Sequence, residues 1–320
     1  MKHSTVNTLA IDAGQSGIRV MHTDAQDSTI LDFAGIRTDQ ELLPQLTSVV
    51  AQFCSQTSLR IDTVAAGVSG LTALESRPDA FLAGIRHLGV TAVYLAHDSV
   101  TGFLGSLGHQ QGAVVAAGTG VVTLGVGPAG LARVDGWGHI MGDAGSGYWI
   151  GRAALEAGLR AFDGRAEPTS LTTLIEQTFA SPETAYIELQ TNPDRVRFIA
   201  SLAKLVAAHA ESDAVARRII RKAGEELALA VATALTKAGS PAGESPQASW
   251  AGALLSSVHL HAAFDAHLRV LVPGVRISAP RGLPLDGVAL LPTLASDNPL
   301  RAAVNVAGFP GAGMAAAASA

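Results

Sequence analysis

Two short glycine-rich turns contain residue types that suit the binding of a polyphosphate. The first covers Asp12 to Ser16 and the second covers Gly118 to Gly120, and each joins two β-prone runs. Glycine lets backbone N–H groups approach a phosphate closely, and small hydroxyls add donors. Either turn alone is more typical of an ordinary hairpin. Because the chain contains two, they favour a nucleotide site, although neither is a GxxxxGK P-loop or a GxGxxG fingerprint.

The stretch from Gly136 to Gly151, GWGHIMGDAGSGYWIG, is the most unusual in the chain. It holds two of the three tryptophans among six glycines. Ordering so many glycines costs conformational entropy, which indicates a need for close backbone approach to a ligand rather than an irregular loop over buried aromatics. Trp137 can pack on a sugar ring, and Asp143 can accept hydrogen bonds from sugar hydroxyls.

Asp98 follows His97 at the end of the apolar run Ala92 to Ala96. A carboxylate at the carboxyl end of a strand can point into a ligand site. A turn from Ser99 to Gly102 is expected to follow, and the structural alternative is that Asp98 simply caps a helix. The histidines show no HExxH spacing, so we predict no metal-binding histidine, and we expect His259 and His261 on the solvated surface.

Strands and helices alternate along most of the chain, which predicts an α/β layered fold with ligands at the carboxyl ends of strands. The pattern of strand, glycine turn and strand restarts at Gly112, which indicates a weak internal repeat. Hydrophobic periodicity predicts strands at 6–11, 18–22, 63–68, 92–96, 113–117, 121–126, a short run ending at 251, and 275–278, and helices at 41–55, 78–87, 147–160 and between 193 and 239.

Length and composition predict a folded protein with two domains, 1–110 and 111–320. The chain has 320 residues, of which 48% are hydrophobic and 15% charged, enough apolar surface for sizeable cores. The net charge of −5 and the lack of a basic run make nucleic acid an unlikely partner. The longest weakly charged stretch, 112–131, is broken by glycines and Pro128, so no membrane span is expected.

Cysteine usage favours a reducing compartment. Cys54 is the single cysteine, so the chain cannot form an internal disulfide or a thiolate zinc cage. The apolar run before Asp12 is too short for a signal-peptide core. A cytoplasmic location is therefore expected.

The order of these motifs resembles eukaryotic-type N-acetylglucosamine kinases, within the BadF/BadG/BcrA/BcrD group of actin-like ATPases. The resemblance covers roughly residues 6 to 292 and is sharpest over Gly136 to Ile150. It implies an α/β actin-like ATPase (ribonuclease H-like) fold, with two domains of mixed sheet flanked by helices and a central cleft. The segments that carry it are Ile11–Ser16, Gly67–Gly70, His97–Asp98, Gly118–Gly120, Gly136–Gly151 and Trp250–Gly252.

The resemblance implies ATP-dependent phosphorylation of the 6-hydroxyl of an amino sugar, N-acetylglucosamine in the first place. Asp98 would be the general base, and Asp12 would reach the Mg²⁺ of Mg²⁺-ATP through water. The partners implied are the amino sugar and ATP, and, by analogy with relatives of the fold, a second copy in a homodimer. ATP would be bound by Gly14, Gln15, Ser16, Gly118, Thr119, Gly120, Gly252 and Ala253, and the sugar by Asp39, Ser69, Gly70, Asp98, Gly136, Trp137 and Asp143.

Departures from the family pattern leave other functions open. Gln15 stands where the family has glycine, Val121 and Val122 replace a serine and an asparagine, and Ala144 replaces a glutamate. The alternatives are a kinase for glucosamine or another hexose derivative, and a catalytically silent sugar sensor. The activators of radical dehydratases need cysteines for an iron–sulfur cluster, and ROK sugar kinases typically carry a cysteine-rich zinc motif; Cys54 alone supplies neither.

Overall fold

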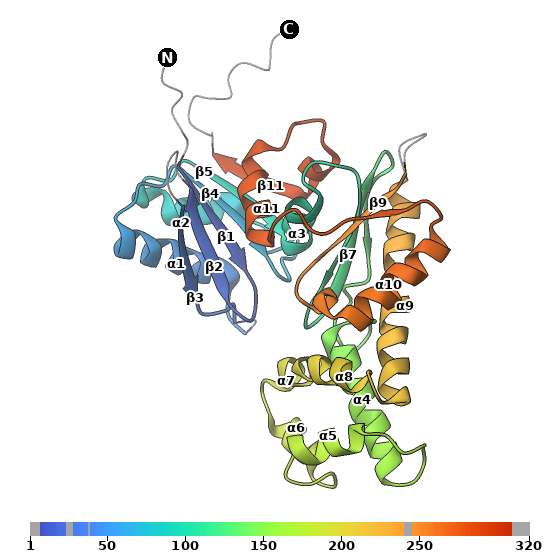
Figure 1. Ribbon diagram of the computed structural model, residues 1–320. Helices are drawn as coiled ribbons and strands as arrows, with labels where there is room; N and C mark the ends of the chain where they lie inside the picture. Colours follow the sequence, from blue (N-terminus) through green and yellow to red (C-terminus); the bar gives the residue numbers. More distant parts are fainter. Residues whose placement is uncertain (1–6, 24–27, 38, 240–244, 309–320) are drawn as a thin grey trace. The chain divides into compact units, whose positions relative to one another are not determined.

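The computed structural model describes residues 7–23, 28–37, 39–239 and 245–308, and the chain divides into two compact units (Figure 1). Unit 1 combines residues 1–110 with residues 280–320, and unit 2 contains residues 111–279. The predicted C-terminal domain, 111–320, was therefore too long. Its last part belongs to unit 1 because β11 (Val304–Gly308) pairs antiparallel with β5 (Ala92–His97).

Unit 1 is built on a six-stranded sheet in the order β11-β5-β4-β1-β2-β3. The first three strands form an antiparallel meander, and β4 and β5 then add parallel to β1. The carboxyl ends of β1, β3, β4 and β5 consequently lie at one edge of the sheet. The new strands are β1 (Thr8–Ala13), β2 (Ile18–Thr23), β3 (Ser28–Phe33) and β4 (Thr63–Val68).

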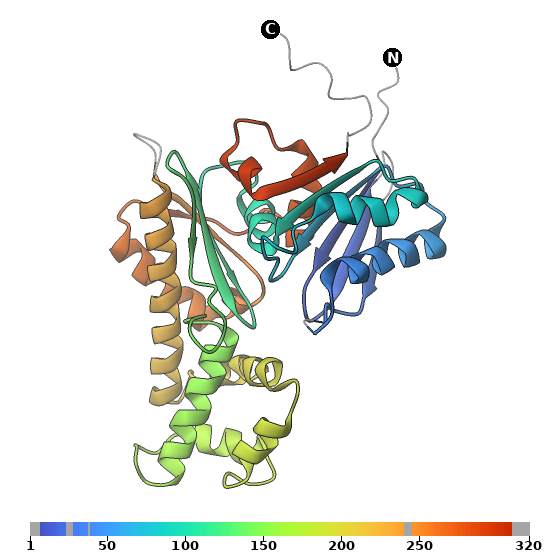
Figure 2. The ribbon, with the colours of Figure 1, turned by 180° about the vertical axis from the view of Figure 1, so that it is seen from behind.

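Helices cover both faces of this sheet (Figures 1 and 2). On one face α1 (Leu42–Thr57) and α2 (Pro78–Ile85) bury a stripe at helical spacing that includes Leu46, Val50 and Phe53. Each such side chain contributes roughly 1.5–3 kcal/mol on burial. The other face carries α3 (Asp98–Leu107) and α11 (Pro284–Leu290).

The close approach of α3 to β4 depends on Gly67. A Cβ atom at this position would lie 2.4 Å from Thr101 Oγ1. Any larger residue would push the start of α3, including Asp98, away from the sheet. Gly67 therefore helps to place Asp98 at the sheet edge.

Unit 2 follows the same path on a five-stranded sheet, in the order β10-β9-β6-β7-β8. A meander is again followed by two strands parallel to its first strand. This confirms the internal repeat at the level of topology, although the repeat is weak in sequence. The strands are β6 (Gly112–Ala117), β7 (Val121–Gly127), β8 (Gly130–Val134), β9 (Gln247–Ala251) and β10 (Arg276–Ile277).

The main core of unit 2 lies between this sheet and α9 (Ala214–Ala238), beside which α10 (Val258–Leu271) packs. A helical segment has a second, smaller core that includes Leu155, Phe179 and Ile199. Its helices are α4 (Gly147–Phe162), α5 (Leu171–Thr178), α6 (Ala185–Thr191), α7 (Arg195–Ser201) and α8 (Ala203–His209).

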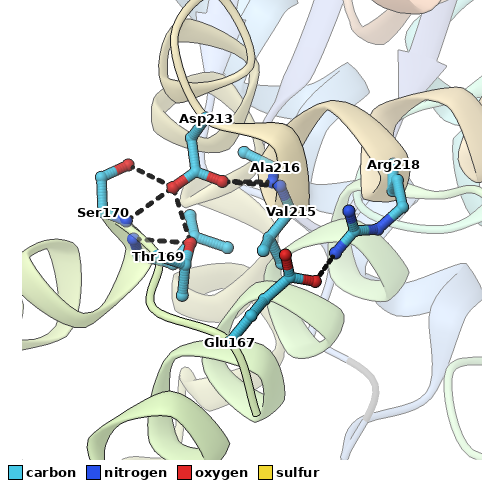
Figure 3. Close-up of polar contacts among 8 residues, drawn as sticks. Glu167, Thr169, Ser170, Asp213, Val215, Ala216 and Arg218 are labelled. Atoms are coloured by element: carbon cyan, nitrogen blue, oxygen red, sulfur yellow. Dashed lines mark hydrogen bonds and ion pairs between the residues drawn. The ribbon is translucent and has the colours of Figure 1, made fainter.

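Asp213 joins this helical segment to α9 (Figure 3). Its Oδ1 accepts N–H bonds from Val215 (2.7 Å) and Ala216 (2.9 Å), which caps the helix. Its Oδ2 accepts from Thr169 Oγ1 (2.7 Å), Ser170 N (2.6 Å) and Ser170 Oγ (2.9 Å). Burial opposes the charged form, but the hydrogen bonds from Ala216, Thr169 and Ser170 outweigh it and hold the pKa of Asp213 well below its usual value. An ion pair of Glu167 with Arg218 lies beside this cluster.

The predicted elements are confirmed for the regular strands and the longer helices, with boundary shifts of a few residues. Val6, the first residue of the first predicted strand, lies outside the described residues. The long region between 193 and 239 is three helices, because α7 and α8 precede α9. Short 3₁₀ helices occur at η1 (Arg86–Leu88), η2 (Leu254–Ser256), η3 (Leu291–Thr293) and η4 (Pro299–Ala303).

Two local predictions were wrong. The turn expected from Ser99 to Gly102 is the first part of α3. His261 is not a solvated surface residue, because its ring packs edge-on against Trp250 with centroids 4.6 Å apart. His259 is exposed, as expected. Within the described ranges, the helices are all too short or too polar to cross a membrane.

Candidate active site

In unit 1 the predicted residues meet at the carboxyl ends of three adjacent parallel strands. Asp12 on β1 lies level with Gly67 on β4, which lies level with Ala96 on β5. Asp98 follows two residues later, at the start of α3. Ser69 is tied to the same edge by its N–H bond to the Ala13 carbonyl (2.9 Å). The fold thus brings residues 12, 69 and 98 to one edge of the sheet.

Asp12 carries its charge in an unfavourable environment. Burial and, secondly, the nearby negative charge of Asp98 raise the pKa of Asp12 to about 6, and Arg19 opposes this only in part. Arg19 lies opposite Asp12 in the ladder between β1 and β2, but its guanidinium pairs with Asp32 at 3.0 Å. The carboxylate pair, Asp12 and Asp98, is therefore short of positive charge.

Asp98 is held at the first turn of α3 without capping the helix. The cap is His97, whose Nδ1 accepts the N–H of Ser99 at 3.2 Å. The same Nδ1 lies 2.9 Å from Asp98 Oδ1. When Nδ1 carries no proton it accepts from Ser99, and when it is protonated it can donate to Asp98 instead. In the tautomer that caps α3, Asp98 Oδ1 is a buried atom without a hydrogen bond.

The first glycine turn lies beside this pair. Gly14 N–H bonds the Gly17 carbonyl (3.0 Å), and Ile36 N–H bonds the Gly14 carbonyl (3.0 Å). Gly35 crosses so closely that a Cβ atom there would lie 2.2 Å from the Gln15 carbonyl oxygen. Gln15 and Ser16 are exposed at the tip of the turn. The turn is therefore fixed by backbone contacts while its tip stays accessible.

In unit 2 the second glycine turn lies at the equivalent position, the carboxyl end of β6. The first N–H groups of α4 bind it, from Gly147 to the Gly118 carbonyl (2.8 Å) and from Tyr148 to the Thr119 carbonyl (3.1 Å). Gly252 has φ +87°, and a Cβ atom there would lie 2.4 Å from the Ala117 carbonyl oxygen. The exposed Gly252 and Ala253 thus follow β9 directly beside the turn.

The tryptophan loop, residues 136–142, lies at the same edge of the unit 2 sheet, after β8. Trp137 is 65% exposed, and the Arg133 guanidinium carbon lies 5.8 Å from the centre of its ring. Arg133 also donates to the Gly136 carbonyl at 2.7 Å. His139 packs edge-on against Tyr148 of α4, with centroids 4.8 Å apart. An accessible aromatic ring is therefore presented beside the second glycine turn.

Asp143 follows the tryptophan loop and is hydrogen-bonded to it. It is only 8% exposed, and its Oδ1 accepts the Gly138 N–H at 3.2 Å. A Cβ atom on Gly120 would lie 2.6 Å from Asp143 Oδ2. Burial and, secondly, the charge of Asp135 raise the pKa of Asp143. The side chain expected to accept from sugar hydroxyls is thus also bonded to the backbone of its own loop.

Not every predicted site residue joins these clusters. Asp39 is exposed, and Arg37 lowers its pKa by donating to it at 2.8 Å. Gly70 is exposed with φ +72° directly after Ser69. The sequence reasoning missed two residues, the helix cap His97 and Asp135. An acidic residue directly before the glycine-rich loop was the available signal for Asp135.

The carboxylate pair fits a divalent cation that arrives with a polyphosphate. Burial and, secondly, the charge of Asp98 raise the pKa of Asp12, and a cation beside the two carboxylates would offset both effects. Over the described ranges there is no cluster of three or more His, Cys, Asp or Glu side chains that could hold a metal by itself. Mg²⁺ commonly uses one or two carboxylates together with phosphate oxygens and water.

The repeated sheet with glycine turns at its edge defines an actin-like ATPase fold, of the class that includes sugar kinases. Residues 10–280 match the BadF/BadG/BcrA/BcrD ATPase family, and the chain belongs to it. The expected α/β fold and the family resemblance are both confirmed.

Two curated relatives are kinases by name. An N-acetylmuramic acid/N-acetylglucosamine kinase of Clostridium acetobutylicum is 31% identical over 207 residues, 60% of this chain and 65% of the relative. An N-acetyl-D-glucosamine kinase of Dictyostelium discoideum is 38% identical over 91 residues, 28% of each chain. The chain therefore spans less than two thirds of the curated relatives that it matches.

Among solved structures, a provisionally assigned N-acetylglucosamine kinase of Chromobacterium violaceum has the same fold. It superposes with a TM-score of 0.70 at 23% identity, covering 89% of this chain and 98% of that one. A ROK family glucokinase of Streptomyces griseus, solved with glucose and AMPPNP, gives a TM-score of 0.53 at 15% identity, covering 89% and 98%.

Proposed function

We propose that this chain is an ATP-dependent kinase that phosphorylates the 6-hydroxyl of an amino sugar, N-acetylglucosamine in the first place. The observation that carries the proposal is the carboxylate pair at the carboxyl ends of the unit 1 strands. The Asp98 side chain is 33% exposed, so its carboxylate is open to a sugar hydroxyl. Membership of an ATPase family and the kinase names of both curated relatives support the same reaction.

Asp98 is the general base of the proposed reaction. The sugar oxygen forms a bond to the γ-phosphorus, the bond from that phosphorus to the bridging oxygen breaks, ADP leaves, and the hydroxyl proton passes to Asp98. The transition state of phosphoryl transfer is loose, so the proton moves late and positioning matters more than basicity. An ordinary carboxylate is therefore sufficient as the acceptor.

ATP and its Mg²⁺ are assigned to the glycine turns and Asp12. Gly14, Gln15 and Ser16 of the first turn and Gly118, Thr119 and Gly120 of the second would face the phosphates, and Gly252 with Ala253 the adenosine. Asp12 would contact Mg²⁺ through water. The positive charge of the cation would offset the burial and the repulsion from Asp98 that together raise the pKa of Asp12.

The sugar is assigned to Ser69, Gly70, Asp98, Gly136, Trp137 and Asp143, with Asp39 as an outlying contact. The exposed face of Trp137 suits a sugar ring. A Cβ built on Gly136 would lie 2.8 Å from Arg133 Nη2 and 3.0 Å from Val122, so a charged and an apolar group both adjoin this position. N-acetylglucosamine is placed before glucosamine because the names of both curated relatives contain it.

The test is ADP release from Mg²⁺-ATP with N-acetylglucosamine, glucosamine, N-acetylmannosamine and glucose. Asp98→Ala should abolish turnover. Asp79→Asn is the matched control, because Asp79 also lies in the first turn of a helix of unit 1 but is exposed. Turnover preferring N-acetylglucosamine, lost only in the Asp98 variant, is the expected result. Sugar binding without turnover would instead support a sugar sensor, and preference for another sugar would reassign the substrate.

A further inference from the structure

Asp135, at the end of β8, has a strained backbone and a fully used carboxylate. Its φ is +58°, in the left-handed region that is unfavourable for a residue with a Cβ. Its Oδ1 accepts the Asp143 N–H at 2.9 Å, and its Oδ2 accepts the Ala144 N–H at 3.0 Å. Such strain persists where the surroundings hold it, and it concentrates at functional sites.

These two bonds close the tryptophan loop at its base. Asp135 precedes the loop and Asp143 follows it, so the carboxylate of the first joins the two ends of the loop. Gly142 fits under this carboxylate only because it lacks a Cβ, which would lie 2.5 Å from Asp135 Oδ1. The closure therefore requires both the carboxylate at 135 and the glycine at 142.

Asp143 in turn contacts the second glycine turn. Its φ is +57°, its Oδ1 accepts from Gly138 N in the loop, and its Oδ2 lies against Gly120. Asp135 thus holds the backbone of Asp143, and Asp143 touches both the tryptophan loop and the turn. The three segments are joined through two carboxylates.

Packing does little to hold the tip of the loop. Ile140 is 85% exposed, Met141 83% and Trp137 65%. Internal bonds from Gly142 N to the Gly138 carbonyl (2.8 Å) and the contact of His139 with Tyr148 shape the loop. The anchors at its base are polar, so its position depends on hydrogen bonds rather than on buried apolar surface.

We propose that Asp135 is a positioning residue that fixes the tryptophan loop and Asp143 against the second glycine turn, and so preorganises the sugar-binding surface of unit 2. The proposal rests on the proposed function for its kinetic consequence. Its structural part stands independently, because the hydrogen bonds exist without any ligand. Asp135 does not touch the reacting atoms and acts through Asp143.

Asp135→Gly separates this role from backbone strain. Glycine adopts φ +58° without strain, so the effect of the variant reports the lost carboxylate and not a change of backbone conformation. It removes both carboxylate bonds. We expect the KM for N-acetylglucosamine to rise about 10- to 100-fold, the range for a lost hydrogen bond to a charged group, while kcat falls less than about threefold. Asp135→Asn, which keeps one acceptor oxygen and tolerates positive φ, should recover part of the loss.

Asp163→Gly is the matched control. Asp163 ends α4 in the same unit, is exposed and pairs with Arg165, so its loss should leave the KM unchanged. An unchanged KM in Asp135→Gly, or a loss confined to the amount of folded enzyme, would overturn the proposal.

Amide hydrogen exchange of the ligand-free protein tests whether Asp135 holds the tryptophan loop and Asp143 in place. This measurement does not depend on enzyme activity. In Asp135→Gly the amides of Gly138, Asp143 and Ala144 should exchange at least about tenfold faster, with the amides of α9 unchanged. Unchanged protection at these three amides would refute the positioning role of Asp135 even if the protein is a kinase. Faster exchange in a protein that turns over no sugar would support the positioning role of Asp135 and reject the proposed function.

Discussion

Two aspartate sites of this chain place the same side chain in opposite circumstances. In unit 2 the Asp213 carboxylate accepts five hydrogen bonds, from the N–H groups of Val215, Ala216 and Ser170 and the hydroxyls of Thr169 and Ser170. In unit 1 the charges of Asp12 and Asp98 repel each other, and Asp98 Oδ1 has no hydrogen bond in the His97 tautomer that caps α3. The pKa of Asp213 is lowered, whereas the pKa of Asp12 is raised to about 6.

The difference separates a structural carboxylate from a binding one. Asp213 stabilises the fold, because its negative charge is better satisfied in the folded chain than in water. The ionised Asp12 destabilises the ligand-free fold, because it is partly desolvated and is repelled by the charge of Asp98. Such groups are retained where a ligand supplies the missing proton donor or cation. Ser170 Oγ lies 2.6 Å from His209 Nδ1, but this cluster is structural rather than catalytic. Asp213 accepts a hydrogen bond from Ser170 and does not orient the histidine.

Replacement of Asp98 should give the largest effect. Asp98→Asn keeps the shape of the side chain but cannot accept the sugar proton as a base, so kcat should fall about 10²- to 10⁴-fold. The free energy of unfolding should stay within about 1 kcal/mol or rise, because a repelling charge is removed. Steady-state kinetics with urea unfolding measures both. A variant with near-normal kcat would show that Asp98 is not the base.

Asp12→Asn should lower turnover and raise stability together. We expect kcat/KM for Mg²⁺-ATP to fall about 10- to 100-fold, because the contact to the cation is weakened. The ligand-free protein at pH 7.5 should become more stable by about 1–2 kcal/mol, since a pKa raised from 3.8 to about 6 means that ionisation of Asp12 costs folding energy.

The sign of the stability change is what distinguishes Asp12 from Asp213. In the original chain, Asp12 favours the folded state below its unfolded pKa, and that contribution is lost as the pH rises through about 6. The increase in the free energy of unfolding caused by Asp12→Asn should therefore be smaller when unfolding is measured at pH 5. A loss of stability at pH 7.5 would contradict the assignment of Asp12 as an undercompensated charge.

Much of unit 1 could be predicted because its signals are local. The strand from Thr63 to Val68 is a continuous buried run between polar residues, and α1 shows a helical stripe, so each follows from its own sequence. Asp12 and Asp98 could be predicted to share an edge because both end strands of one parallel set.

Other features depend on partners distant in the sequence. Nothing in the sequence from Val304 to Gly308 indicates that β11 pairs with β5, so the C-terminal residues were assigned to the wrong domain. His97 takes the cap of α3 because its ring, fixed by the strand before it, reaches the Ser99 N–H. The role of Asp135 depends on a backbone conformation, φ +58°, which glycine would more commonly adopt.

Asp213→Ala should affect stability alone. Loss of the helix cap and of the bonds to residues 169 and 170 should cost about 2–3 kcal/mol at pH 7. The kcat per folded molecule should not change. Asp265→Ala, in which an exposed i,i+4 pair with Arg269 is lost, is the control and should cost at most about 0.5 kcal/mol.

The pH dependence of this loss follows from the lowered pKa. Asp213 stabilises the fold fully above the pKa of an unfolded aspartate, and this contribution is lost as the pH falls from there through its lower pKa in the folded chain. The difference in the free energy of unfolding between Asp213→Ala and the original chain should therefore become smaller at acid pH. A difference that grows in acid would show that the hydrogen bonds do not require the ionised carboxylate.

The smallest expected effect is on the acid limb of the rate profile. In the free enzyme Asp12 must be ionised to meet the cation, so kcat/KM for Mg²⁺-ATP should fall about tenfold per pH unit below about 6, under saturating sugar. The limb of kcat should lie at lower pH, because the bound cation favours the charged form of Asp12. In Asp12→Asn the limb near pH 6 should vanish while the residual rate persists. If that limb survived, the ionisation at about pH 6 would belong to another group, and the contrast between Asp12 and Asp213 would no longer explain the pH dependence of catalysis.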